Sequence, residues 1–150
     1  MTVSIVKEQE TSKSHAKETV IVSLCALGAQ CRYDGKSQKM GQFLYEETST
    51  EQLMNKYIVL PLCGEIMGGL RTPREPCDVV ETPEGLRVIG RNNSKDFTAA
   101  YNKGALEALR LAKIFKVKKA YLLKDSPMCE KGYGILTRML EEKGIHVSYV

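Results

Sequence analysis

The sequence predicts an α/β fold, and three observations support this prediction. Short apolar runs rich in β-branched residues recur along the chain, each bounded by turn-forming residues. Segments with the apolar spacing of amphipathic helices lie between the later runs. Strands that alternate with helices favour a parallel sheet covered on both faces. We therefore expect a single three-layer domain with a mostly parallel, Rossmann-like sheet of four or five strands.

The first half of the chain predicts a tail, two strands and a short helix. Residues 1–18 are polar, charged and aperiodic, so we expect a flexible tail ahead of one domain over 19–150. The β-branched run at 19–24 predicts the first strand, and the apolar run at 57–62 predicts the second. Between them, 49–56 opens with an N-cap candidate and an acidic first turn, which predicts a short helix.

The second half predicts a loop, a hairpin or further loop, and two strand–helix pairings. Glycine and proline are too frequent in 63–76 for regular structure, so this stretch is predicted to be a loop. The clearest helix covers 96–116, with an apolar face formed by Phe97, Tyr101, Ala105, Ala108, Ala112 and Phe115. The other predicted elements are a strand over 118–124, a helix over 134–144 and a final strand over 145–150. Residues 77–90 fit either a hairpin or a loop with little regular structure.

Composition narrows the class of protein. With 150 residues and 43% hydrophobic content, the chain is long enough for one core without disulfides. Its net charge of +4 is mild and scattered, so nucleic acid is an unlikely partner. The first residues lack the apolar region of a secretory signal, and no apolar run approaches the ~18 residues of a membrane span. We therefore expect a cytoplasmic protein, where structural disulfides are rare.

Three of the five cysteines directly follow predicted strands or the short loops after them. Cys25 follows the first strand, Cys63 the second and Cys129 the third. In an open parallel sheet, the carboxyl ends of the strands lie along one edge, where ligands bind. The three thiols are therefore predicted to converge. Cys31 and Cys77 have no such placement, because one lies deeper in a loop and the other begins the hairpin.

Converging thiolates indicate a soft metal centre, and the residues alone leave its kind open. Zinc in a structural site usually takes four protein ligands, and an iron–sulfur cluster is normally held by four cysteines. With only three cysteines, one iron of a cluster would remain open for chemistry. Free cysteines are also commonly buried as small apolar residues, and no C-x-x-C pair is present.

Two further residues near these cysteines have side chains suited to proton transfer. Glu65, two residues after Cys63, is a candidate general acid or base, although a solvated loop glutamate is the commoner situation. Ser126, three residues before Cys129, could bind substrate or simply cap the turn. Arg71 and Arg74 could hold an anion or a carbonyl-rich base, although surface salt bridges are the default for such residues.

Four blocks of the sequence together resemble a known family. They are "VSLCALGAQCRYDGKSQK", "VLPLCGEIMGGLRTPREPCDVV", "DFTAAYNKGALEALRLAK" and "YLLKDSPMC". In order and spacing they are similar to the thiouracil desulfidases (TudS-like), a bacterial family formerly catalogued as a domain of unknown function. The resemblance covers about residues 19–150.

The resemblance implies a [4Fe-4S] cluster held by Cys25, Cys63 and Cys129. It also implies removal of sulfur from thiouracil or a related small thiolated pyrimidine, with oxygen from water replacing the sulfur and sulfide released. Glu65 matches the acid that works in proton transfer in this family, and Ser126 matches the serine that positions or protonates the substrate.

The chain also departs from the family pattern. Gly64 stands where proline is usual, Met128 where serine is usual and Glu130 where glycine is usual, and the loop after Cys129 is short. These departures bear on substrate choice and on catalysis. Two alternatives therefore stand beside the desulfidase: a non-catalytic or divergent relative that binds a small ligand, and a zinc protein that adds Cys31 or Cys77 to the ligand set.

Overall fold

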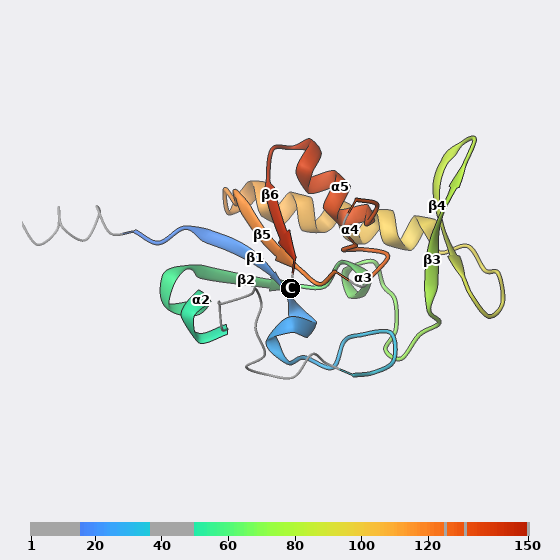
Figure 1. Ribbon diagram of the computed structural model, residues 1–150, viewed down its shortest axis with the longest axis horizontal. Coiled ribbons are helices and arrows are strands. Elements are labelled where there is room, and N and C mark those ends of the chain that lie inside the picture. The colour runs from blue at the N-terminus through green and yellow to red at the C-terminus, as the bar shows by residue number, and fades with distance from the viewer. Residues whose placement is uncertain (1–15, 37–49, 125, 131, 150) are drawn as a thin grey trace, which may run out of the picture.

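Four parallel strands form the central sheet of the protein. The computed structural model describes residues 16–36, 50–124, 126–130 and 132–149. Within them the strand order is β2-β1-β5-β6. The strands are β1 (Thr19–Ser23), β2 (Ile58–Leu62), β5 (Lys119–Leu122) and β6 (His146–Tyr149). Their parallel course brings their carboxyl ends to the same edge, beside the one-turn 3₁₀ helix η1 (Leu24–Leu27) and the short helix α3 (Gly64–Met67) (Figure 1).

Helices cover both faces of this sheet, so the predicted three-layer α/β architecture is confirmed. On one face, Leu53 of α2 (Thr50–Lys56) packs with Val20 and Val22 of β1. On the other face lie α4 (Thr98–Ile114) and α5 (Ile135–Glu142), whose buried residues join the larger core with Ile21 and Ala120. Alternate residues of β1 therefore enter different cores, as the period of two in a strand requires.

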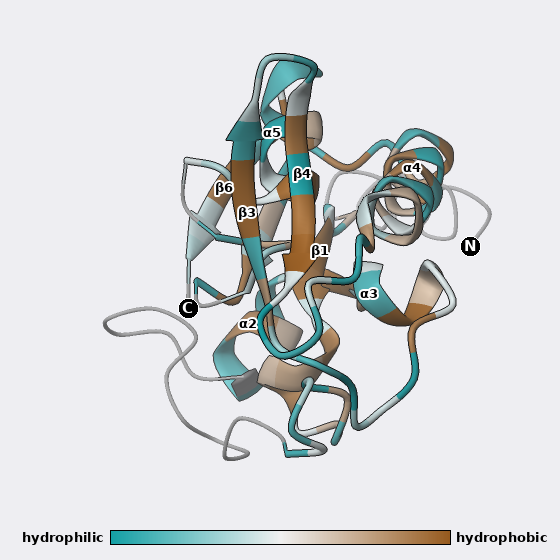
Figure 2. Ribbon diagram, turned by 90° about the vertical axis from the view of Figure 1, so that its right-hand side faces the viewer, coloured by the Kyte–Doolittle hydropathy of each residue, from teal (hydrophilic) through white to brown (hydrophobic). Residues whose placement is uncertain are grey.

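A separate antiparallel hairpin lies beside the main sheet. It pairs β3 (Cys77–Thr82) with β4 (Gly85–Gly90), so the hairpin is the correct one of the two alternatives for 77–90. Figure 2 shows it hydrophilic at its turn and hydrophobic along much of its two strands. Val88 of β4 is fully buried in the larger core, and its backbone N–H donates to Thr98 Oγ1 at 2.8 Å. The hairpin is thereby attached to the beginning of α4.

The predicted apolar face of α4 is mostly correct. Tyr101, Ala105, Ala108 and Ala112 are buried, whereas Phe115 is 49% exposed because the helix has already ended at Ile114. The expectation of an irregular loop over 63–76 was wrong at its start, where α3 makes one helical turn. Glycines allow this turn to lie directly on α4, since a Cβ on Gly104 would lie 1.7 Å from the backbone oxygen of Gly64.

The predicted tail lies largely outside the described residues. Residues 1–15 are not described, and Ala16–Glu18 are exposed and without regular structure ahead of β1. Within the described part of the chain, none of the helices is both long enough and apolar enough to cross a membrane.

Candidate active site at the carboxyl edge of the sheet

The three strand-end cysteines line one cavity of about 210 Å³. Cys25 lies in η1 directly after β1, and Cys63 stands at the N-cap of α3 directly after β2. Cys129 follows β5 through a turn in which its N–H donates to the Ser126 carbonyl oxygen at 3.0 Å. Thr137 of α5 donates to the Cys129 carbonyl oxygen at 2.8 Å and fixes this turn on the helix. The sheet topology thus brings together the three residues that the spacing singles out.

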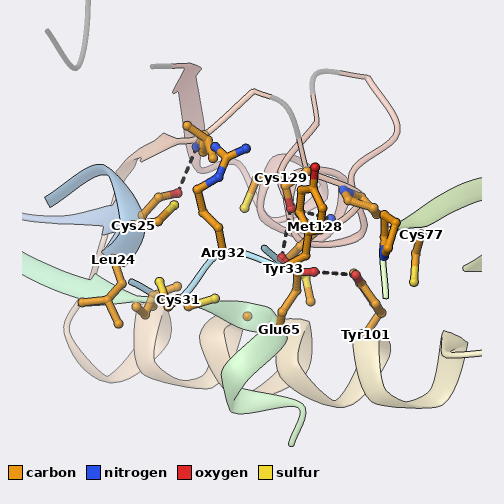
Figure 3. A pocket seen from close by; sticks show the side chains of 18 of the residues that line it. Leu24, Cys25, Cys31, Arg32, Tyr33, Glu65, Cys77, Tyr101, Met128 and Cys129 are labelled. Carbon is orange, nitrogen blue, oxygen red and sulfur yellow. Dashed lines mark hydrogen bonds between the residues drawn. The ribbon is translucent and has the colours of Figure 1, made fainter. Parts of the chain in front are cut away.

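Cys31 and Cys77 line the same cavity, although neither follows a strand end. Figure 3 shows Cys31 with Cys25 on one side of Glu65, and Cys77 beside Tyr101 on the other. Cys31 packs in an apolar cluster with Cys25 and Leu123, with Cys63 against it. The signal for this position is present in the sequence, because the loop that leaves β1 at the carboxyl edge must pass over that edge before it departs.

The thiols of this cavity are held away from water. Contact with the Cys25 thiol is the largest of the effects that raise the pKa of Cys31 to about 11. Contact with Cys31, followed by burial, raises the pKa of Cys63, while burial and then the nearby Glu65 carboxylate raise that of Cys129. Thiols in such surroundings are protonated at neutral pH, so a bound metal must displace their protons.

The thiols of the cavity are soft ligands, which suit zinc or an iron–sulfur cluster. Around one tetrahedral zinc with Zn–S bonds of about 2.3 Å, all the ligating atoms lie within a few ångströms of one another. Among the described residues, no three histidine, cysteine or acidic side chains are gathered closely enough to hold one ion. In an iron–sulfur cluster each thiolate binds a different iron, so its cysteines stand further apart around a common space. Cys25, Cys63 and Cys129 line one common cavity from three separate segments, which fits a cluster held by three cysteines.

Glu65 lies at the centre of a hydrogen-bond network in the cavity wall. The residue is only 8% exposed, so it is not the solvated loop glutamate that is the commoner case. Tyr101 of α4 donates its hydroxyl to Glu65 Oε1 at 2.5 Å, and Ser126 donates to Oε2 at 3.3 Å. Arg74 Nη2 lies 3.3 Å from Oε2. The acid is therefore fixed by partners from three separate segments, and burial together with the Glu65 charge raises the pKa of the Tyr101 hydroxyl.

The Ser126 hydroxyl caps a turn and also lines the cavity. Its hydroxyl accepts the Met128 backbone N–H at 3.2 Å, which is the capping of a turn. The same hydroxyl donates to Glu65 and lines the cavity. The Ser126 hydroxyl and the Glu65 carboxyl group are therefore hydrogen-bonded to each other beside the cysteines.

Tyr101 and Arg74 are the site residues that sequence reasoning misjudged. The helical spacing identified Tyr101 only as part of the apolar face of α4, and nothing local distinguishes its hydroxyl. Arg74 was expected on the surface, but its side chain is 7% exposed. Burial is the largest single effect and lowers the pKa of Arg74, but the charge and the hydrogen bond of Glu65, with smaller contributions from Cys63 and Tyr101, together outweigh it, so the pKa is raised. Arg71 remains exposed, as expected for a surface arginine.

Two of the departures from the family pattern are in contact with each other. A Cβ on Gly64 would lie 2.8 Å from Met128 Sδ and 2.9 Å from its Cγ, closer than real side chains approach. Met128 is fully buried and lines the cavity. The Met128 side chain therefore occupies the space beside Gly64 that a side chain at position 64 would fill. The two departures depend on each other for their packing.

The fold and the cavity together define an α/β protein with a cysteine-lined site and a buried carboxyl group. A family model described as 2-thiouracil desulfurase matches residues 20–149, and the chain belongs to this family. The family resemblance, and with it the class of enzyme predicted from the sequence, is thereby confirmed.

Two known proteins illustrate the relationship. The chain is 29% identical over 122 residues to the uncharacterized protein YbbK of Bacillus subtilis (strain 168), covering 76% of this chain and 74% of that protein. It is 31% identical to a solved structure described as the [4Fe-4S]-dependent thiouracil desulfidase TudS. That match has a TM-score of 0.75 and covers 89% of this chain and 91% of the other.

Proposed function

We propose that the protein is a [4Fe-4S]-dependent desulfidase that acts on thiouracil or a related small thiolated pyrimidine in the cytoplasm. The observation that carries the proposal is the meeting of Cys25, Cys63 and Cys129 with the Glu65–Ser126 pair in one cavity. Family membership and the similarity to a [4Fe-4S]-dependent thiouracil desulfidase support it.

In this proposal Cys25, Cys63 and Cys129 hold the cluster. When bound, the cluster supplies an iron without a protein ligand, and iron in such clusters is suited to soft sulfur ligands. The net reaction exchanges one sulfur for one oxygen: the thiocarbonyl and water give the carbonyl and hydrogen sulfide. No electrons are gained or lost, so no external reductant is needed.

Glu65 and Ser126 handle the protons of this exchange. Water must lose its protons as its oxygen bonds to the ring carbon, and the departing sulfur must gain them. A carboxyl group within hydrogen-bond distance of a hydroxyl can pass a proton between the two. Tyr101 and Arg74 hold the carboxyl group, and Ser126 is its hydrogen-bond partner on the turn that leads to Cys129.

Arg32 supplies donors for the substrate ring in this proposal. It lines the cavity, where Figure 3 shows it between Cys25 and Cys129. Its ion pair with Asp34 is long, with Nε 3.8 Å from Oδ1. Arg91, which also lines the cavity, is instead fully engaged with Asp78 through three hydrogen bonds. The guanidinium of Arg32 is therefore the better placed to bind a ring carbonyl oxygen.

The test is anaerobic purification followed by cluster reconstitution and an assay with 2-thiouracil and 4-thiouracil. We expect a brown protein that releases sulfide and yields uracil in equal amounts. A brown protein that releases no sulfide would contradict the proposed substrate. A colourless protein with bound zinc would contradict the proposed cofactor and favour the zinc alternative.

A further inference from the structure

Arg74 is a buried arginine in a stretch without regular structure. It lies between α3 and β3, and its side chain is 7% exposed, although arginine is almost never buried unless it is paired. Neither a helix nor a strand fixes its position. Its placement must therefore come from the contacts of its own guanidinium and backbone.

The guanidinium of Arg74 binds two segments that belong to different parts of the site. Nε donates to Glu65 Oε1 at 3.4 Å, and Nη2 lies 3.3 Å from Oε2, so both carboxylate oxygens face one fork. Nη2 also donates to the backbone oxygen of Cys31 at 2.8 Å. In addition, the Arg74 backbone N–H donates to the Tyr33 carbonyl oxygen at 2.7 Å. One residue thus connects Glu65 with the loop that carries Cys31.

The remaining donors hold the guanidinium in a single orientation. Nη1 donates to the Thr72 hydroxyl and to the Arg71 carbonyl oxygen, each at 3.0 Å. The planar fork of arginine can satisfy all these acceptors together, whereas the ammonium of lysine is a point charge with no such geometry. Rotation of the group to improve one contact would break the others.

We propose that Arg74 is a positioning residue that sets Glu65 relative to the loop carrying Cys25 and Cys31. Cys25 lies in η1 at the start of this loop, and Arg74 holds the same loop at the Cys31 carbonyl oxygen. The carboxyl group is held by the same guanidinium. Arg74 therefore couples retention of the cluster to the placement of the acid. The part of this inference that concerns turnover rests on the proposed function.

The variants Arg74→Gln and Arg74→Lys test the inference, with Arg71→Gln and Arg71→Lys as matched controls. Arg71 lies with Arg74 in the stretch between α3 and β3. It is exposed and contributes its backbone oxygen to the contacts of Arg74. All proteins are reconstituted with iron and sulfide. The measurements are the rate at which an iron chelator removes iron, together with kcat and KM for sulfide release from 4-thiouracil.

We expect Arg74→Gln to speed iron loss and to lower kcat, each by roughly 10- to 100-fold, the usual cost of removing a residue that orients a metal ligand. KM should change little, because Arg74 supports Glu65 rather than the substrate. Arg74→Lys should not restore either value, since lysine cannot bind Glu65 and the Cys31 carbonyl oxygen together. Both Arg71 variants should behave like the wild type.

A double-mutant cycle with Glu65→Gln separates coupling from general damage. If the two residues act through one contact, the kcat of the double variant is no lower than that of the more affected single variant. If the fold-decrease of kcat in the double variant equals the product of the two single decreases, the inference is overturned. So would Arg74→Gln or Arg74→Lys values within twofold of their Arg71 controls. If the wild type releases no sulfide, the proposed function fails, while the iron-loss rates still decide the role of Arg74.

Discussion

The two sides of the cavity are built by different means. The cysteine side, made by Cys25, Cys63 and Cys129, is placed by the sheet, because each residue follows a parallel strand that ends at the same edge. The carboxylate side, made by Glu65, Arg74, Tyr101 and Ser126, is placed by side-chain hydrogen bonds between segments. The difference teaches that a fold can position a ligand set, while the orientation of an acid depends on particular side-chain partners.

The two sides should therefore fail in different ways when they are altered. Loss of a residue on the cysteine side removes a proposed ligand and should abolish cofactor binding. Loss of a residue on the carboxylate side leaves the three cysteines in place and should chiefly reduce turnover, and at Arg74 it should also speed the loss of iron.

The largest effect is expected from Cys129→Ser on the cysteine side. The variant should lose the broad visible absorbance and most of the bound iron after anaerobic reconstitution, because only two of the three proposed ligands remain. Cys77→Ser is the matched control, since Cys77 lines the same cavity from the hairpin. Iron content measured by a colorimetric assay checks both variants. If both variants lose iron equally, Cys129 at the strand end is no more important for cofactor binding than Cys77 in the hairpin.

On the carboxylate side, Glu65→Gln should lower kcat by roughly 10²- to 10⁴-fold, the usual contribution of a general acid or base. Iron content should stay at the wild-type level, because the three cysteines are unchanged. Glu107→Gln is a suitable control, since Glu107 lies on the solvent side of α4 and pairs with Arg110. Wild-type turnover in Glu65→Gln would remove the proton-transfer role.

A third change tests the contact between Gly64 and Met128. Gly64→Ala places a methyl group against Met128 and should destabilise the protein by roughly 1–3 kcal/mol, as overpacking of a core does. Thermal unfolding of the reconstituted protein measures the loss. In the double variant with Met128→Ala, the methyl group has room, so the combined loss should be smaller than the sum of the single losses. Simple additivity would show that the two positions are independent.

The sequence predicted the cysteine side well for a physical reason. Hydrophobic periodicity identifies strands, alternation with helices makes them parallel, and parallel strands end together. Cys25, Cys63 and Cys129 could therefore be grouped although they are far apart along the chain. The same reasoning failed for Cys31 and Cys77, because their positions depend on the paths of loops rather than on strand ends.

The carboxylate side was only partly predictable. Glu65 and Ser126 were identified from their closeness to cysteines in the sequence, but their partners were not. Tyr101 is 36 residues from Glu65, and its hydroxyl reaches the acid only because glycines let α3 lie directly on α4. Arg74 is buried through contacts that no periodic pattern records. Its sequence neighbourhood is that of an ordinary surface arginine.

A smaller effect is expected from Cys31→Ser, which asks whether Cys31 belongs to the cysteine side. The thiol contacts Cys25 and Cys63, but the proposed ligand set does not include it. Iron content should remain at the wild-type level, and iron loss to a chelator should rise by less than roughly 10-fold. The comparison is with Cys25→Ser, which removes a proposed ligand from the same loop. If both variants lose iron equally, Cys31 is a ligand, as in the zinc alternative.

The smallest effect is expected at Asp96, where the hairpin is attached to the start of α4. Tyr101 of the carboxylate side lies on this helix. Asp96 accepts the Thr98 backbone N–H at the start of α4 at 2.8 Å and pairs with Arg87 of β4. Its contacts with Thr98, followed by Arg87, lower the pKa of Asp96 to about 2 from the ordinary value of 3.8. A depressed pKa in the folded state means that Asp96 stabilises the protein above pH 3.8, and that this contribution is lost as the pH falls through about 2.

Asp96→Asn removes the titrating group and should therefore flatten the fall in melting temperature between pH 3.8 and about 2. The variant should also melt slightly below the wild type at neutral pH, where the charge on Arg87 loses its partner. Asp78→Asn is the comparison, because Asp78 pairs with Arg91 and its lowered pKa has no link to α4. If Asp78→Asn flattens the profile as much as Asp96→Asn, acid acts on the hairpin generally. A flattening confined to Asp96→Asn instead locates the acid sensitivity at the attachment of α4, the helix that carries Tyr101 to Glu65.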